Sequence, residues 1–230
     1  ALLDTTYNNI YPIVIGKFFS ANDLGNYTRA QQFSSLPSSN VSGILQRVTF
    51  PVLSSIQNED ERLSRNYRKI LKTSAFLIFP MMLMLSAVAA PLIRVLLTDK
   101  WVGCIILLQI ICFDMMWYPI HAINLSLLTL KGRSDLFFRL EIIKKIVGVC
   151  IMCVTIPHGV IWMVSGSVVS SMIALIINTY YTGKLIRVGY LKQMGDVLPI
   201  FGVALFMWFV IHVSLLLTPN IYIQLPVGIC

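Results

Sequence analysis

Long apolar runs are the feature of this sequence that most restricts how the chain can fold. Seven follow one another, each close to the length at which a helix crosses roughly 30 Å of hydrocarbon. The predicted spans are Leu2–Phe19, Tyr27–Val52, Thr73–Leu97, Gly103–Leu128, Phe137–Ile156, Val160–Gly183 and Val197–Leu217. Continuous rather than alternating apolar runs favour helices over a transmembrane barrel. The predicted fold class is therefore all-α, a polytopic bundle of transmembrane helices.

The composition excludes an ordinary soluble domain. Only 12% of the residues are charged and 57% are hydrophobic, whereas soluble domains are about a quarter charged. A soluble core of this size has no room for so much apolar surface. We therefore expect lipid to be the main solvent. The net charge of +8 is interpreted as a signal of membrane topology and not of nucleic-acid binding.

Basic residues gather in alternate connections between the predicted spans. Residues 57–72, 131–139 and 184–192 hold eleven Lys and Arg, whereas the intervening connections hold one, Lys100. The positive-inside rule predicts that the basic connections face the cytoplasm. Within the first connection, residues 58–72 combine apolar residues at helical spacing with basic residues on other faces. This pattern predicts an amphipathic helix at the membrane interface.

The two ends of the sequence predict an internal fragment of a longer transporter. The chain opens on an apolar stretch without an initiator Met, and it closes inside the apolar run Ile221–Cys230, which is too short to span. We expect one transmembrane lobe over residues 1–217 and the start of a truncated further span at residues 218–230.

The second predicted span carries two arginines on one helical face. At 100° per residue Arg47 returns to the direction of Arg29, and Gln32 and Asn40 lie within about 60° of it. Arginine binds phosphate through a planar fork, so the four residues are candidate substrate-binding groups in a wet cavity. The alternative is that each arginine extends to the nearer membrane surface.

Four further charged residues fall inside predicted spans. Asp114 lies near the middle of the fourth span, and Glu141, Lys144 and Lys145 lie in the fifth. Ionisable groups in such places are costly and commonly functional, which suggests binding of a coupling ion or substrate. The alternative is packing between helices, with Glu141 and Lys145 paired at i,i+4. The sequence leaves both interpretations open.

No pattern predicts a metal, a cofactor or a catalytic residue. Cys150 and Cys153 form a C-x-x-C without the second pair that a zinc site needs, and the three histidines fall on different spans or loops. The small residues around Gly166 in the sixth span are interpreted as a close helix-packing surface. They are Ser165, Gly166, Ser167, Ser170 and Ser171.

Three stretches resemble a known family of transporters. The segment LGNYTRAQQFSSLPSSNVSGILQRVTFPVLSSIQ (residues 24–57), residues 117–146 and residues 177–190 are similar to Wzx-type polysaccharide and lipopolysaccharide biosynthesis flippases. These belong to the multidrug/oligosaccharidyl-lipid/polysaccharide (MOP) exporter superfamily. The resemblance implies two six-helix lobes around a central cavity with alternating access, and this chain would be the second lobe.

The function implied by the resemblance is translocation of undecaprenyl-pyrophosphate-linked oligosaccharide repeat units for O-antigen, capsule or exopolysaccharide assembly. The implied location is the bacterial inner (plasma) membrane, which the protein crosses several times. The implied partners are the lipid-linked oligosaccharide, membrane lipids, a coupling ion (H⁺ or Na⁺) and the missing N-terminal lobe. One alternative is a multidrug or cation antiporter of the same superfamily, for which we expect acidic and aromatic cavity walls. A membrane glycosyltransferase or acyltransferase is disfavoured because the loops are short and lack a catalytic constellation.

Overall fold

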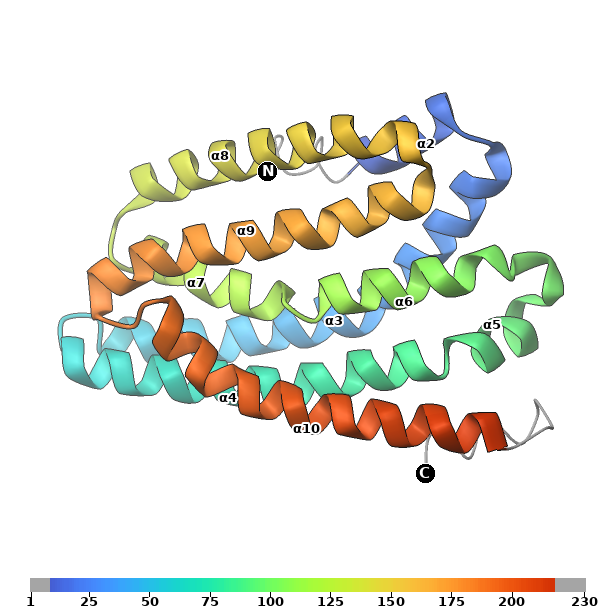
Figure 1. The fold of residues 1–230 in the computed structure, drawn as a ribbon. Coiled ribbons are helices and arrows are strands. Elements are labelled where there is room, and N and C mark those ends of the chain that lie inside the picture. Colours follow the sequence, from blue (N-terminus) through green and yellow to red (C-terminus); the bar gives the residue numbers. More distant parts are fainter. Residues whose placement is uncertain (1–8, 218–230) are drawn as a thin grey trace.

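The computed structural model describes residues 9–217. All regular secondary structure in that range is helical (Figure 1). The elements are α2 (Ile10–Phe18), α3 (Ala21–Ser55), α4 (Asp60–Ala87), α5 (Ala89–Leu97), η1 (Asp99–Trp101), α6 (Gly103–Met115), α7 (Tyr118–Leu130), α8 (Ser134–Thr155), η2 (Ile156–His158), α9 (Val160–Ile186) and α10 (Tyr190–Leu217). The predicted all-α fold class is confirmed. The truncated span predicted at residues 218–230 lies outside the described residues.

The outer surface of the bundle is apolar, as a lipid-facing surface must be. Phe76, Trp162 and Phe206 are 70%, 62% and 70% exposed. Within residues 9–217, four helical stretches are long and apolar enough to cross a membrane: Asp60–Ala87, Gly103–Leu130, Val160–Ile186 and Tyr190–Leu215. The protein is thus a multi-pass membrane protein. The additional spans predicted at α3 and α8 remain predictions, as does the span Leu2–Phe19, of which residues 2–8 lie outside the described residues.

Helix α3 begins earlier than the sequence pattern predicted. Its N-cap is Ser20, whose side chain accepts a hydrogen bond from the backbone N–H of Asp23, while the Asp23 carboxylate accepts one from the backbone N–H of Ser20. This capping box satisfies two backbone donors that a helix N-terminus leaves free. The helix then continues through Pro37 and Pro51 to Ser55.

Helix α4 includes the stretch predicted as a separate interfacial helix. It runs unbroken from Asp60 to Ala87, so residues 58–72 contribute its first turns instead of a helix of their own. The apolar face that we assigned to the membrane interface packs on protein, because neighbouring helices cover it. Leu63, Tyr67 and Leu71 have no exposed surface.

A buried carboxylate fixes α4 to α10. Asp196, near the start of α10, has a side chain that is 5% exposed. Arg68 donates to it through Nε at 2.6 Å and Nη2 at 2.7 Å, and Lys72 Nζ lies 2.9 Å away. Two cations from consecutive turns of α4 therefore compensate for the burial of one charge.

The three basic connections meet at one end of the bundle. Figure 1 shows the α3–α4, α7–α8 and α9–α10 connections together at the left. Lys131 joins two of them, because its Nζ lies 2.7 Å from the Asp60 carboxylate and donates to the Gln57 carbonyl at 2.7 Å. The basic connections, which alternate with non-basic ones along the sequence, therefore lie together at one end of the bundle. Its cytoplasmic location remains a prediction.

Candidate functional site

A helix break in the membrane region organises the candidate site. The apolar run 103–130 divides at Met116 and Trp117 into α6 and α7. Pro119 has no N–H to offer the carbonyl of Met115, four residues earlier, so a regular helix cannot continue there. The Ser38 hydroxyl of α3 donates to that carbonyl at 2.8 Å. A neighbouring serine thus satisfies the freed backbone group, which makes the break tolerable in lipid.

Small side chains bring α3 close enough for this contact. Ala30, Ser34, Ser38 and Ser42 recur every fourth residue, and each is at most 1% exposed. Such small residues allow helix backbones to approach closely in membranes. They also fix the orientation of α3, because the face that they form is turned towards the other helices of the bundle.

A cavity of about 450 Å³ lies beside the break, with walls from α2, α3, α6, α7, α8 and α9. Its lining residues are Tyr11, Tyr27, Gln31, Ile111, Asp114, Met115, Tyr118, His121, Leu125, Phe137, Glu141, Lys144, Lys145, Val164, Ser167, Ser170, Ser171 and Ala174. The cavity therefore brings together the four charged residues predicted as coupling or packing groups. Broken helices beside a polar cavity are typical of transporter binding sites.

Asp114 enters this cavity between helices. Ser167 of α9 donates to its Oδ2 at 3.3 Å, whereas Oδ1 is buried without a hydrogen-bond partner among the described residues. A buried carboxyl group with one oxygen that accepts no hydrogen bond is well suited to hold a proton.

His121 belongs to the same cavity, although the sequence did not single it out. The Asn178 amide nitrogen lies 3.2 Å from its Nδ1, and the Ser171 hydroxyl lies 3.1 Å from its Nε2, both at hydrogen-bond distance. These partners lie 57 and 50 residues away in sequence. No metal site accompanies them: among residues 9–217 no group of three or more His, Cys, Asp and Glu side chains can hold a metal ion.

Glu141, Lys144 and Lys145 form a partly buried ion cluster on the α8 wall. Lys144 donates to Glu141 Oε1, and Lys145 Nζ lies 3.7 Å from Oε2. The three side chains are only 13–17% exposed, so solvent screens the pairs weakly. The cluster and Asp114 line the same cavity.

The arginine-bearing face of α3 points away from this cavity. Arg29, Gln32, Asn40 and Arg47 are all exposed, on the side opposite the buried serines. Arg29 Nη1 donates to Gln32 Oε1 at 3.0 Å and its guanidinium lies 5.7 Å from the Trp101 ring centroid. The polar residue of α3 that lines the cavity is Gln31. The candidate substrate residues and the candidate coupling residues thus occupy two different surfaces.

The serines near Gly166 have a different role from the predicted one. Gly166 does pack closely, because a Cβ there would lie 3.0 Å from the Ile151 side chain of α8. In contrast, Ser167, Ser170 and Ser171 line the cavity and supply hydroxyl groups to it. The sequence pattern could not separate these functions, since small residues satisfy both.

Comparison with known proteins finds sequence similarity to polysaccharide biosynthesis proteins. Residues 1–106 match the family model described as polysaccharide biosynthesis protein. The chain is 26% identical over 189 residues to an uncharacterized membrane protein in the cps region of Klebsiella pneumoniae, covering 80% of this chain and 38% of that protein. It is 26% identical over 144 residues to the lipopolysaccharide biosynthesis protein WzxC of Escherichia coli, covering 63% and 29%.

The fold of the chain is similar to about half of a solved membrane protein structure. The structure of the lipid II flippase MurJ in an inward closed conformation matches with a TM-score of 0.75 at 19% identity, covering 96% of this chain and 48% of that one. The architecture of this chain therefore corresponds to about half of that structure. Together with the relatives, it confirms the resemblance to Wzx-type polysaccharide flippases of the MOP exporter superfamily. The chain spans less than two-fifths of the length of the two relatives above.

Proposed function

We propose that this chain is one lobe of a transporter, and not an enzyme, that moves undecaprenyl-diphosphate-linked oligosaccharides across a bacterial inner membrane for polysaccharide assembly. The observation that carries this proposal is the exposed arginine face of α3 on a lobe that matches half of a flippase. Charged side chains are expensive against lipid, so this face requires another protein surface or water beside it. The second half of the transporter supplies both, with a central cavity between the lobes.

The spacing of the two arginines suits a substrate that crosses the membrane. Arg29 and Arg47 are 18 residues apart, which is about 27 Å along a helix axis at 1.5 Å per residue. This is close to the ~30 Å thickness of the hydrocarbon layer. One guanidinium therefore serves each end of the path, and each binds the diphosphate through its planar fork. Two moderate sites release a moving anion more readily than one strong site.

Arginine substitutions test this function in the whole protein. Arg29→Ala or Arg47→Ala should lower the translocation rate about tenfold to a hundredfold, which is the range expected for losing a hydrogen bond to a charged group. Lysine at either position keeps the charge without the fork and should cost less. The rate is measured in vesicles carrying the lipid-linked glycan, with Arg139→Ala, an exposed cation on another helix, as control. Normal rates for both alanine variants would show that the arginines only reach for the membrane surface.

The coupling ion of this transporter is a proton, and Asp114 is the group that binds it. One oxygen of this carboxyl group has no hydrogen-bond partner among the described residues, and His121 lines the same cavity. The amines of Lys144 and Lys145 on the cavity wall disfavour a second small cation such as Na⁺ there. Protonation of Asp114 changes the charge balance with the α8 cluster and thereby biases the packing of α8 against α6 and α9.

One observation favours the alternative of a cation exporter. Tyr11, Tyr27, Tyr118 and Phe137 give the cavity aromatic walls around Asp114, and aromatic faces attract organic cations. Efflux of ethidium from cells that express the whole protein distinguishes the two functions. We expect no efflux above that of a strain without the protein, because the two lysines repel a cationic ligand.

A further inference from the structure

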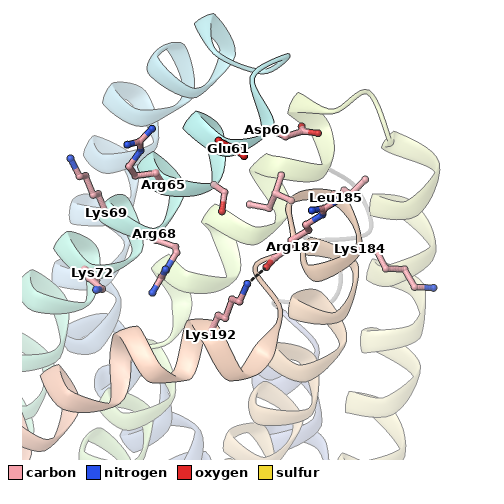
Figure 2. Close-up of a pocket in the computed structure, with 12 residues that line it drawn as sticks. Asp60, Glu61, Arg65, Arg68, Lys69, Lys72, Lys184, Leu185, Arg187 and Lys192 are labelled. Carbon is pink, nitrogen blue, oxygen red and sulfur yellow. Dashed lines mark hydrogen bonds between the residues drawn. The ribbon is translucent and has the colours of Figure 1, made fainter.

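A large groove at the basic end of the bundle is not used by the proposed transport path. It encloses about 980 Å³ between the first turns of α4, the end of α9 and the start of α10 (Figure 2). Its lining residues are Asp60, Glu61, Ser64, Arg65, Arg68, Lys69, Lys72, Lys184, Leu185, Ile186, Arg187 and Lys192. Seven of these twelve are basic and two are acidic, so the groove is an anion-attracting surface.

Part of this positive charge is already engaged. Arg68 and Lys72 share the Asp196 carboxylate, as described above. Lys192 donates to the backbone carbonyl of Arg187 at 3.0 Å. Lys184 lies 4.6 Å from the Tyr180 ring centroid and extends away from the other cations in Figure 2. These four side chains line the groove, but their existing contacts leave fewer N–H donors available to a ligand.

Three cations of the groove form no close ion pair with a carboxylate among the described residues, although Arg187 interacts at longer range with Asp60, whose carboxylate Lys131 already binds. Arg65 and Lys69 lie on α4, and Arg187 lies across the groove in the α9–α10 turn (Figure 2). Arg187 has a left-handed backbone with φ of 57°. The turn is tight, because a Cβ on Gly183 would lie 2.9 Å from the Cα of Gly189. The backbone of the third cation is therefore fixed opposite the other two.

We propose that this groove binds an anionic lipid headgroup that carries two phosphate groups. Unpaired cations on two facing walls match two separate anionic groups better than one. The guanidinium groups bind phosphate oxygens in a bidentate manner. Basic pockets at the ends of membrane-spanning helices are suited to such headgroups, since each Lys or Arg near an anionic membrane adds to the attraction.

Two lipids supply this chemistry at the basic end. One is an anionic phospholipid of the diphosphatidylglycerol class, and the other is the polyprenyl diphosphate of the transported substrate. The second source rests on the proposed function, whereas the first does not. The groove lies apart from both the Asp114 cavity and the arginine face of α3, because these share no lining residue with it.

The test measures lipid binding by the purified whole protein in neutral detergent. The probes are diphosphatidylglycerol, a polyprenyl diphosphate without sugar, phosphatidylcholine and inorganic pyrophosphate, and bound lipid is counted by native mass spectrometry. The groove variants are Arg65→Gln with Lys69→Gln, and separately Arg187→Asn, since asparagine tolerates a left-handed backbone. A charge-matched control combines Lys100→Gln with Arg139→Gln, two exposed cations outside the groove.

We expect both diphosphate lipids to bind in preference to phosphatidylcholine, with affinity that falls as salt rises. Each removed cation should weaken binding roughly fivefold, so the double groove variant should weaken it by more than about tenfold. The control variant should bind like the wild type. Loss of only one diphosphate lipid identifies the source. Equal binding by wild-type and groove variants, equal loss in the control, or equally tight inorganic pyrophosphate would each overturn the proposal. Translocation assays report separately on the proposed function.

Discussion

Asp114 is the residue on which the proposed proton coupling depends. Asparagine has the same shape and still accepts the hydrogen bond from Ser167, but it cannot bind a proton. We therefore expect Asp114→Asn vesicles to lose the response of glycan translocation to an imposed pH gradient while the protein still inserts and folds. Ser170→Ala, which alters the same cavity without touching the carboxyl group in any recorded bond, serves as control. An unchanged pH response in Asp114→Asn would leave Asp114 a packing residue.

The sequence allowed prediction of individual charged residues but not of their partners. Asp114, Glu141, Lys144 and Lys145 stand out because charges are rare in apolar runs. His121 did not, since a lone histidine carries no local signal, and its partners belong to another helix. One signal was available and unused. Pro119 implies a free carbonyl at Met115, and a polar side chain from a neighbouring helix is then required.

At the scale of helices, a buried polar cluster holds three elements together. Asn124 of α7, Thr182 of α9 and Gln193 of α10 have no exposed surface. Thr182 donates to Asn124 Oδ1 at 2.7 Å, and the Asn124 and Gln193 amides exchange bonds of 3.0 and 3.1 Å. Such reciprocal bonds are strong only while every member is satisfied.

Removing the central member of this cluster should destabilise the bundle. Asn124→Ala leaves the Thr182 hydroxyl and the Gln193 amide without their buried partner, at a cost of about 1–3 kcal/mol. The measurement is unfolding of the purified protein in mixed micelles with increasing denaturing detergent. Asn22→Ala, an exposed asparagine in the first turn of α3, should unfold like the wild type. If the two variants were equally stable, the cluster would contribute nothing measurable.

Helix positions were predictable because hydrophobic runs of this length have one stable form in lipid. The ends of helices and the breaks within them were less predictable. The division at Val88 and the merging of residues 58–72 into α4 depend on neighbouring helices, which a single run does not encode. The amphipathic pattern was real, but the sequence did not say whether protein or lipid would cover Leu63 and Tyr67.

At the scale of the whole molecule, charged residues occupy three separate regions: one end of the bundle, an outer face of α3 and the internal cavity. The α3–α4, α7–α8 and α9–α10 connections form one basic end, where Lys131 and Asp60 join two of them. The arginines of α3 lie on an outer face, and the acidic and basic groups of the cavity lie inside the lobe. This separation suits a transporter whose substrate path runs beside the lobe while the coupling ion binds within it.

Membrane orientation follows from the eleven-to-one distribution of Lys and Arg and is directly testable. The whole protein is first stripped of its native cysteines, because Cys150 and Cys153 are exposed on α8. Single cysteines then replace exposed residues in the basic connections, at Asn58, Ser134 and Leu191. In intact spheroplasts these should resist a membrane-impermeant maleimide and react only after permeabilisation, because the positive-inside rule places them in the cytoplasm.

Cysteines at the opposite end are the matched controls for this orientation. Asn22 lies in the first turn of α3 and His158 lies between α8 and α9, and both are exposed. Each should react in intact spheroplasts without permeabilisation. The two sets must behave oppositely, since a helix bundle with connections at two ends cannot expose both to one side. Ready labelling at residue 58, 134 or 191 in intact cells would reverse the orientation and would also place the phosphate-binding groove on the outer leaflet.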